Sequence, residues 1–180
     1  MEMLGIQEGS SGCSFDVYFG VQTPKTSMIL SKSCIYGIQA TIFVAAQGGG
    51  GHVPISRIAE QLDISFHFLT KVLQQLTSAG ILESMRGPRG GVVLARPVAE
   101  ITLFDLVSAI DGTDIFTECM LGLPGCGFAA PCPAHDLWLE VRNKFTHVAK
   151  SVTIQALAER SAELHVRLTG SLREFLPSTS

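Results

Sequence analysis

Three of the five cysteines in this chain of 180 residues lie close together and are followed by a histidine. They are Cys119, Cys126 and Cys132, and His135 follows the last of them. Thiolates are soft ligands that suit zinc, copper(I) and iron–sulfur clusters. The residues between the cysteines are rich in Gly and Pro, which lets a short loop wrap around a compact inorganic group. The spacing therefore indicates a loop that binds a metal or a cluster.

The gaps in the pattern C-x6-C-x5-C help to distinguish which metal or cluster this loop binds. Structural zinc sites usually contain tight C-x2-C or C-x4-C pairs, so the wider gaps suit zinc less well. A 2Fe-2S cluster needs four ligands, and because histidine can replace cysteine on an iron, three cysteines and His135 complete the set. An iron–sulfur cluster is therefore favoured, and zinc, a metal-free redox disulfide and unliganded thiols are the alternatives. The other role open to His135 is to cap the helix that follows.

The remaining two cysteines are not expected to bind a metal. Cys34 falls in a mostly apolar helical stretch, residues 31–47, where a thiol packs as a small hydrophobic side chain. Cys13 lies in residues 1–27, which are rich in Gly, Ser and Thr and show no periodic pattern. We expect those first residues to form a loose, disordered extension.

A helix-turn-helix precedes the cysteine loop. Apolar residues recur at helical spacing over residues 55–62 and 69–76, with a tight break at 63–65. Ser65 is expected to cap the second helix, because its hydroxyl can accept a hydrogen bond from a first-turn amide. Gly80 is expected to end that helix in left-handed backbone.

The next segment, ILESMRGPRGGVVLARP, predicts a two-stranded hairpin whose turn carries two arginines. Those arginines, Arg86 and Arg89, are expected to contact phosphates or to enter the minor groove of DNA. In a helix-turn-helix the second helix lies in the major groove and its first turns contact the bases. The candidate residues on that helix are Ser65, His67, Phe68, Thr70, Lys71 and, one turn later, Gln74 or Gln75.

The distribution of charge favours an anionic partner for this half of the chain. Residues 28–98 carry six basic and three acidic side chains, although the net charge of the whole chain is −3. That net charge argues against a protein that binds nucleic acid through bulk charge alone. A basic segment joined to an acidic remainder is expected when one end of a protein meets DNA. The alternative is a small α+β core with no role in DNA binding.

The compartment and the absence of catalytic motifs also follow from the sequence. No segment reaches the roughly 20 apolar residues of a membrane span, and the first residues do not resemble a secretory signal. We therefore expect a soluble protein of the reducing cytoplasm, where clustered cysteines more often bind metal than form disulfides. No nucleophile–base pair, phosphate-binding Gly-rich loop or pair of acids indicates an enzyme.

Helices are predicted on both sides of the cysteine loop. A short helix is expected over residues 102–110. After the loop, one long helix is predicted by apolar residues at spacings of 4, 4, 3 and 4, namely Leu137, Val141, Phe145, Val148 and Val152. A further amphipathic helix is predicted by the same kind of spacing at Leu164, Leu168, Leu172 and Phe175.

Together these segments resemble the Rrf2 family of bacterial winged-helix regulators. MILSKSCIYGIQA is similar to the family's first helix, RIAEQLDISFHFLTKVLQQLTSAGIL to its helix-turn-helix and MRGPRGGVVLAR to its wing. TLFDLVSAIDG resembles the linking helix, and the segment from Cys119 to His135, followed by DLW, resembles the cluster loop. The resemblance spans about residues 28–157.

The resemblance implies a mainly α fold with a small β-wing. Its parts are a disordered extension (1–27), a winged helix-turn-helix domain (28–98), a linking helix with the cluster loop (99–136), and a dimerisation helix with a tail (137–180). It also implies a homodimer that binds double-stranded DNA at a near-palindromic operator. Some relatives take a fourth cluster ligand from the first helix of the partner subunit, where this chain offers only Cys34 and Ile35. A trailing histidine and a 2Fe-2S cluster are therefore favoured over a 4Fe-4S cluster.

We predict a DNA-binding transcription regulator, acting as a repressor, whose promoter binding is controlled by an iron–sulfur cluster. The cluster would sense redox state, nitric oxide or iron–sulfur status. Two alternatives remain. One is a cluster-free or zinc-binding winged-helix regulator, and the other is a redox or metal-handling module that does not bind DNA.

Overall fold

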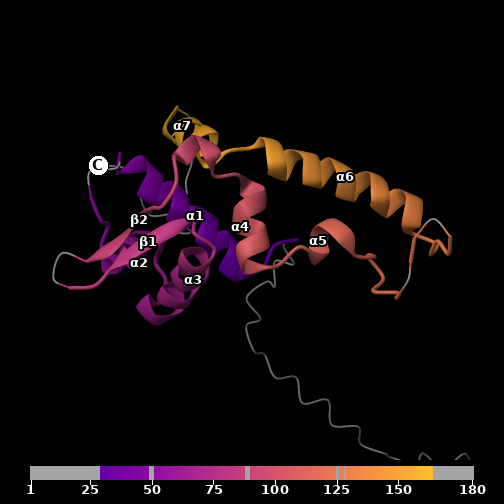
Figure 1. Ribbon diagram of the computed structural model, residues 1–180, viewed down its shortest axis with the longest axis horizontal. Coiled ribbons are helices and arrows are strands. Elements are labelled where there is room, and N and C mark those ends of the chain that lie inside the picture. Colours follow the sequence, from indigo (N-terminus) through magenta and orange to yellow (C-terminus); the bar gives the residue numbers. More distant parts are fainter. Residues whose placement is uncertain (1–28, 49–50, 88–89, 125, 128, 164–180) are drawn as a thin grey trace, which may run out of the picture.

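The computed structural model describes residues 29–48, 51–87, 90–124, 126–127 and 129–163. Within them the fold is mainly helical with one two-stranded antiparallel sheet, which confirms the predicted class (Figure 1). None of the helices described is long and apolar enough to cross a membrane. In chain order the elements are α1 (Lys32–Ala46), α2 (Ile55–Leu62), α3 (Phe66–Ser78), β1 (Leu82–Met85), β2 (Gly91–Leu94), η1 (Val98–Glu100), α4 (Leu103–Ile110), α5 (Asp114–Thr117), α6 (His135–Ser151) and α7 (Ile154–Glu163).

One apolar core holds together the winged domain, which in the structure comprises α1 to α3, both strands, η1 and α4. The predicted apolar faces of α2 and α3 point into this core, together with side chains from α1, α4 and the strands. The largest side chains that are almost wholly buried in it are Ile58, Leu69, Leu73, Leu76, Ile81, Leu82, Val92, Ile101, Leu106 and Ile154. Gly37 permits close packing at one edge, because a Cβ atom there would lie 2.3 Å from Cδ1 of Ile110.

The helix-turn-helix has nearly the predicted bounds, but one of its caps differs from the prediction. Ser65 occupies the N-cap position of α3, yet its side chain makes no capping hydrogen bond. The predicted hydroxyl cap is therefore wrong. Ser65 is exposed, so water can satisfy the first-turn amides in its place. Gly80 follows α3 with a φ of 68°, which confirms the left-handed stop.

The wing consists of β1 and β2, with Leu82 opposite Leu94 and Met85 opposite Gly91. Val53, which precedes α2, forms an isolated antiparallel bridge with Val92. Gly91 lies at this crossing, where a Cβ atom would be 2.2 Å from the carbonyl oxygen of Val53. Glycine is therefore needed for the two backbones to approach each other.

Two of the α-helices described were not predicted from the sequence. One is α5, a single turn between α4 and the cysteine loop. The other is α7, which returns to the winged domain and packs against α1, with Ile154 fully buried. The predicted extension over residues 1–27 and the apolar repeat that begins at Leu164 both lie outside the described residues.

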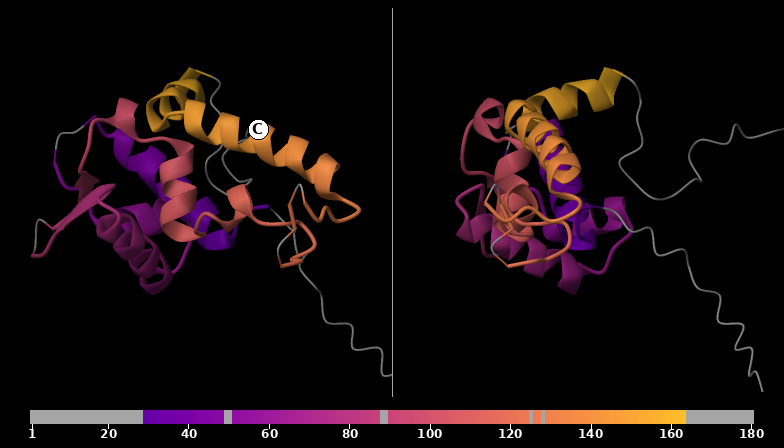
Figure 2. Two further views of the ribbon diagram at one scale, coloured as in Figure 1. Left: turned by 45° about the vertical axis from the view of Figure 1, so that its right-hand side comes forward. Right: turned by 90° about the vertical axis from the view of Figure 1, so that its right-hand side faces the viewer.

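The long helix α6 projects from the winged domain and carries the cysteine loop at its far end (Figures 1 and 2). Its C-terminal end is tied to the domain by backbone hydrogen bonds. The N–H of Leu103 donates to the carbonyl of Val152 at 2.9 Å, and Thr102 forms an antiparallel bridge with Thr153. The cysteine loop and the wing are thus at opposite ends of the molecule in Figure 1, and α6 runs between the loop and the base of the winged domain.

Candidate metal centre and nucleic-acid interface

The loop between α5 and α6 brings together three sulfur atoms. The Sγ atoms of Cys119, Cys126 and Cys132 all lie within 4.8 Å of one another, and each residue is half-buried. Within this set, the Sγ atoms of Cys119 and Cys132 are 3.6 Å apart. The Sγ atom of Cys126 lies 3.4 Å from Nδ1 of His135, the first residue of α6. All four predicted ligands are therefore neighbours.

The two short separations have the length expected for pairs of ligands on one metal atom. With metal–sulfur bonds of about 2.3 Å and tetrahedral angles, two thiolates on one zinc lie about 3.8 Å apart. A thiolate and an imidazole on one metal lie slightly closer, because the metal–nitrogen bond is about 2.0 Å. The donor set of three thiols and one imidazole fits both an iron–sulfur cluster and zinc.

Hydrogen bonding and burial shift the acidity of the thiols in the loop. Hydrogen bonds with the backbone of Leu123 and Leu121 lower the pKa of Cys119 to about 7. Desolvation raises the pKa of Cys132 above its usual value. Of these two thiols, Cys119 is therefore the one that ionises near neutral pH. The thiolate is the form that binds metals.

Cys34 is a core residue, as predicted. Its side chain is fully buried in the apolar cluster that includes Val107 and Phe116. It does not belong to the group formed by the other three cysteines. Burial, reinforced by the nearby carboxylate of Asp111, raises the pKa of this thiol to about 12. Such a thiol stays protonated at neutral pH, so it is poorly suited to bind metal.

Helix α6 presents two faces, and they differ from the single seam that the sequence predicted. Phe145 points inward and stacks on Phe116 of α5, with ring centroids 5.5 Å apart. Ala149, one turn later, is also buried. The other residues of the predicted seam within the helix are exposed, with fractions of 74% for Leu137, 51% for Val141 and 48% for Val148. An apolar stripe on α6 thus has no covering within the described part of the chain.

The second helix of the helix-turn-helix, α3, exposes most of the predicted DNA-contacting residues. Ser65, His67, Lys71, Gln74 and Gln75 are exposed. The side chains of two other predicted residues, Phe68 and Thr70, already make contacts within the domain. The ring of Phe68 is half-buried and packs edge-on against Tyr36 of α1 at 5.8 Å, and the hydroxyl of Thr70 donates to the carbonyl of Phe66 at 2.8 Å.

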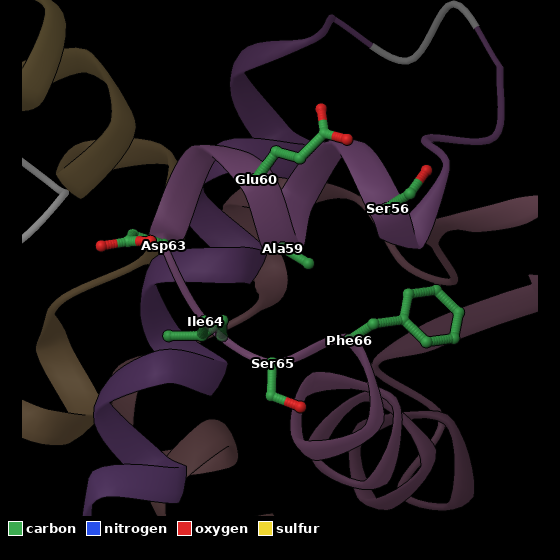
Figure 3. A pocket seen from close by; sticks show the side chains of 7 residues that line it. All are labelled: Ser56, Ala59, Glu60, Asp63, Ile64, Ser65 and Phe66. Carbon is green, nitrogen blue, oxygen red and sulfur yellow. The ribbon is translucent and has the colours of Figure 1, made fainter.

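Phe66 is the residue on α3 that the sequence reasoning missed. It is 48% exposed at the first turn of the helix, and its ring projects beside a pocket of about 430 Å³ between α2 and α3 (Figure 3). An exposed aromatic ring at the start of a recognition helix suits contact with a thymine methyl. The carboxylates of Glu60 and Asp63 at the same pocket point in different directions, so they do not form a cation site (Figure 3). Phe66 keeps the helical spacing of Leu69 and Leu73, so the sequence carried no signal that its ring is exposed.

The wing exposes Arg86 at the end of β1. Met85, beside it, is 45% exposed. The second predicted wing residue, Arg89, lies outside the described residues. In Figure 1 the wing and α3 lie on the side of the molecule away from the cysteine loop.

Comparisons with known proteins cover the winged domain, the cysteine loop and α6. Residues 30–160 match the family described as "Rrf2: Iron-dependent Transcriptional regulator". The HTH-type transcriptional regulator IscR of Photorhabdus laumondii is 30% identical over 139 residues, which are 77% of this chain and 84% of that protein. Among solved structures, CymR, the global cysteine regulator of B. subtilis, has a TM-score of 0.63 at 28% identity, covering 73% of this chain and 96% of that one. T. potens IscR has a TM-score of 0.62 at 25% identity, covering 78% and 93%.

Proposed function

Because the chain belongs to the Rrf2 family of transcriptional regulators, we propose that it is a homodimeric repressor whose operator binding is controlled by an iron–sulfur cluster. As members of this family are, the chain is a winged-helix, DNA-binding transcriptional regulator and not an enzyme. The proposal concerns the cluster, the signal, the dimer and the operator. The signal would be redox state, nitric oxide or the supply of iron–sulfur clusters.

The observation that carries the proposal is the pairing of ligands in the cysteine loop. Cys119 with Cys132, and Cys126 with His135, form two pairs at 3.6 Å and 3.4 Å. A 2Fe-2S cluster takes two protein ligands on each of its two irons, so two pairs supply what it needs. When bound, such a cluster supplies one-electron redox chemistry at a potential set by its ligands and surroundings.

The winged domain would bind DNA through α3 and the wing. Lys71 and Gln75, which are both exposed, would contact base edges or phosphates in the major groove, together with exposed His67 and Ser65 nearer the start of α3. Thr70 is half-buried, with its hydroxyl bonded within α3. Phe68 remains a candidate only along the edge of its ring that does not contact Tyr36. Arg86, and Arg89 beyond the described residues, would contact the minor groove or the backbone.

A second copy of the chain is the proposed cover for the apolar stripe of α6. Exposed apolar positions along one side of a helix mark a surface that another element buries. Two copies that pair through Leu137, Val141 and Val148 would form a two-fold axis and present two recognition helices. On B-DNA, such helices bind half-sites about 34 Å apart, which matches a near-palindromic operator.

Coupling between the loop and DNA would run along α6. The helix begins at His135 in the metal centre, and its other end is bridged to the start of α4. Ordering of the loop would therefore bias the angle of α6 relative to the winged domain, and with it the spacing of two recognition helices. A coupling free energy of about 1 to 3 kcal/mol would change DNA affinity roughly 5- to 150-fold.

The test is the metal content of protein purified without oxygen. We expect iron and acid-labile sulfide in equal amounts, near two of each per chain, and a red-brown colour that is absent when all three clustered cysteines are replaced by serine. Protein that contains neither iron nor sulfide under these conditions would contradict the proposal.

Zinc is a second candidate occupant, favoured by one observation. The three sulfur atoms lie within 4.8 Å of one another, which is close enough for all of them to bind one tetrahedral ion with His135 as the fourth ligand. A zinc site would stabilise the loop, and the zinc ion itself would carry no electron. The same metal analysis separates the candidates, since a zinc protein is colourless and contains one zinc and no sulfide.

A further inference from the structure

The peptide that leads into Cys119 is held by two side chains of α6. The indole N–H of Trp138 donates to the carbonyl of Glu118 at 2.9 Å. The guanidinium of Arg142 donates to the carbonyl of Thr117 at 2.7 Å and to that of Glu118 at 3.2 Å. These two carbonyls are the last ones before Cys119, so the three hydrogen bonds lie immediately next to the first cysteine of the metal centre.

The carbonyls of Thr117 and Glu118 need hydrogen-bond donors because they lie at the C-terminal end of α5. This helix has only four residues, and the carbonyl groups in the last turn of any helix have no partner within it. A cationic donor at the end of a helix satisfies such groups and interacts favourably with the helix dipole. Both contacts of Arg142 come from one terminal nitrogen, Nη1, whose N–H groups are fixed in the guanidinium plane, whereas the ammonium group of a lysine rotates freely.

The same face of α6 carries the other end of the metal centre. His135 is the first residue of the helix, and its N–H donates to the carbonyl of Cys132 at 2.9 Å. Trp138 and Arg142 follow at spacings of three and four residues, which places them on the same side of the helix as His135. Phe145 continues this side and stacks on Phe116 in the middle of α5.

From this arrangement we propose that Arg142 and Trp138 are positioning residues for Cys119, which fix it to the helix that begins at His135, three residues after Cys132. The inference rests on the cluster function proposed above. Without this clamp of three hydrogen bonds, Cys119 would be joined to the other ligands through the backbone of residues 119–126 and through the stacking of Phe116 on Phe145. With it, the first and last ligands are held on one rigid helix before any metal binds, so less conformational entropy is lost on binding.

The clamp also gives the metal centre a direct mechanical link to α6. The residues that hold Cys119 lie near the start of α6, the helix along which the proposed coupling runs. Movement of Cys119 away from its place would break hydrogen bonds to Trp138 and Arg142 and alter the start of α6. Neither residue is a ligand, so their replacement removes the positioning and leaves every donor of the centre in place.

Four variants of the full chain test this proposal. Trp138→Phe keeps an aromatic ring and removes the indole donor, whereas Arg142→Ala removes both guanidinium contacts. Arg142→Lys restores the charge with a single compact donor group. Lys144→Ala is the matched control, because Lys144 is an exposed cation of α6 that pairs with Glu140 and does not contact the loop.

The first readout is the rate at which visible cluster absorption is lost in excess chelator, after loading with iron and sulfide without oxygen. From the usual contribution of one hydrogen bond, we expect loss to be about fivefold faster in Trp138→Phe and about tenfold or more in Arg142→Ala. Arg142→Lys should lie between Arg142→Ala and the unmodified chain, and Lys144→Ala should match the unmodified chain.

The second readout needs no cluster. In metal-free protein, hydrogen exchange of amides 118–122 should be faster in Trp138→Phe and Arg142→Ala, with α1 to α3 unchanged as evidence that the winged domain is folded. Exchange and cluster lifetime equal to those of the unmodified chain would overturn the proposal. If the unmodified chain takes up no iron, the cluster function fails, and amide exchange alone then decides whether the clamp exists.

Discussion

The winged domain and the cysteine-loop region, residues 112–152, differ in how much apolar surface they bury. The winged domain buries a continuous apolar core that includes residues from α1, α2, α3, both strands, α4 and α7. In the described part of residues 112–152, by contrast, the buried hydrophobic residues are Phe116 and Ala149. The large hydrophobic residues exposed there are Met120, Leu121, Leu123, Leu137, Val141 and Val148.

This difference shows which half of the molecule depends on partners. The winged domain can hold its shape through burial of its own side chains, since burial of apolar surface is the main source of folding free energy. The cysteine-loop region has a small apolar cluster and a set of hydrogen bonds instead, and its exposed apolar residues need a cover. A bound cluster and a second subunit would supply the missing contacts. A regulated element is expected in the region whose stability depends on what binds to it.

The largest expected effect is on the core of the winged domain. Leu73 is 1% exposed, and Leu73→Ala should lower the free energy of unfolding by about 2 to 5 kcal/mol, because it removes buried methyl groups and leaves a cavity. Chemical denaturation at fixed protein concentration measures this change. Gln74→Ala, at the neighbouring exposed position, should change stability by less than about 0.5 kcal/mol. Similar losses in both variants would show that the core is not where the stability lies.

The next effect concerns the exposed stripe of α6. Val141→Asp would place two like charges at the proposed two-fold interface, and such a juxtaposition costs several kcal/mol. We expect the dimer to dissociate at least about a hundredfold more readily, as measured by sedimentation, with little change in the unfolding of the winged domain. Asn143→Asp puts the same charge on another side of α6 and should leave the dimer intact. A Val141→Asp protein that still sediments as a dimer would place the interface elsewhere.

A smaller effect is expected when one ligand is removed from the metal centre. His135→Ala should shorten the lifetime of the bound cluster at least about tenfold, since even groups that only support metal ligands often contribute that much. His135→Cys should keep the cluster and change its visible spectrum. His147→Ala is the control, because His147 is exposed further along the same helix. If His135→Ala holds the cluster as long as His147→Ala does, His135 is not a ligand.

The smallest of these effects concerns one cation of the wing. Arg86→Ala should weaken operator binding by about tenfold and lower the slope of log Kd against log salt by about one, because one phosphate contact is lost. Arg160→Ala, an exposed arginine on α7, should leave both quantities unchanged. Fluorescence anisotropy with a labelled operator across a range of salt concentrations gives both values. An unchanged slope would remove Arg86 from the interface.

The sequence predicted the winged domain well because its signals are local. Leu69, Leu73 and Leu76 repeat at the helical period, and Gly80 marks the end of their helix. The hydroxyl cap at Ser65 was predicted wrongly, since solvent can take the place of a capping side chain at an exposed helix start. The helix α7 was missed because its burial depends on contact with the distant α1, and its own apolar pattern is short.

The metal centre was predictable in composition but not in arrangement. The spacing of the cysteines and His135 indicated a common site, whereas the pairing of Cys126 with His135 depends on how the loop turns. Periodicity grouped Phe145 with Leu137 and Val141, but it cannot tell a face that stacks on α5 from one that awaits a partner. Trp138 and Arg142 carry no motif, because they act on backbone carbonyls that any sequence provides.

The most direct test of the central claim compares operator affinity with and without the cluster. The same preparation should be measured before and after removal of the cluster by chelation without oxygen, on a promoter site found by genome-wide binding. We predict that Kd changes about 5- to 150-fold while the protein remains dimeric. Equal Kd values for the cluster-loaded and cluster-free dimers would contradict the claim that the cysteine loop controls DNA binding.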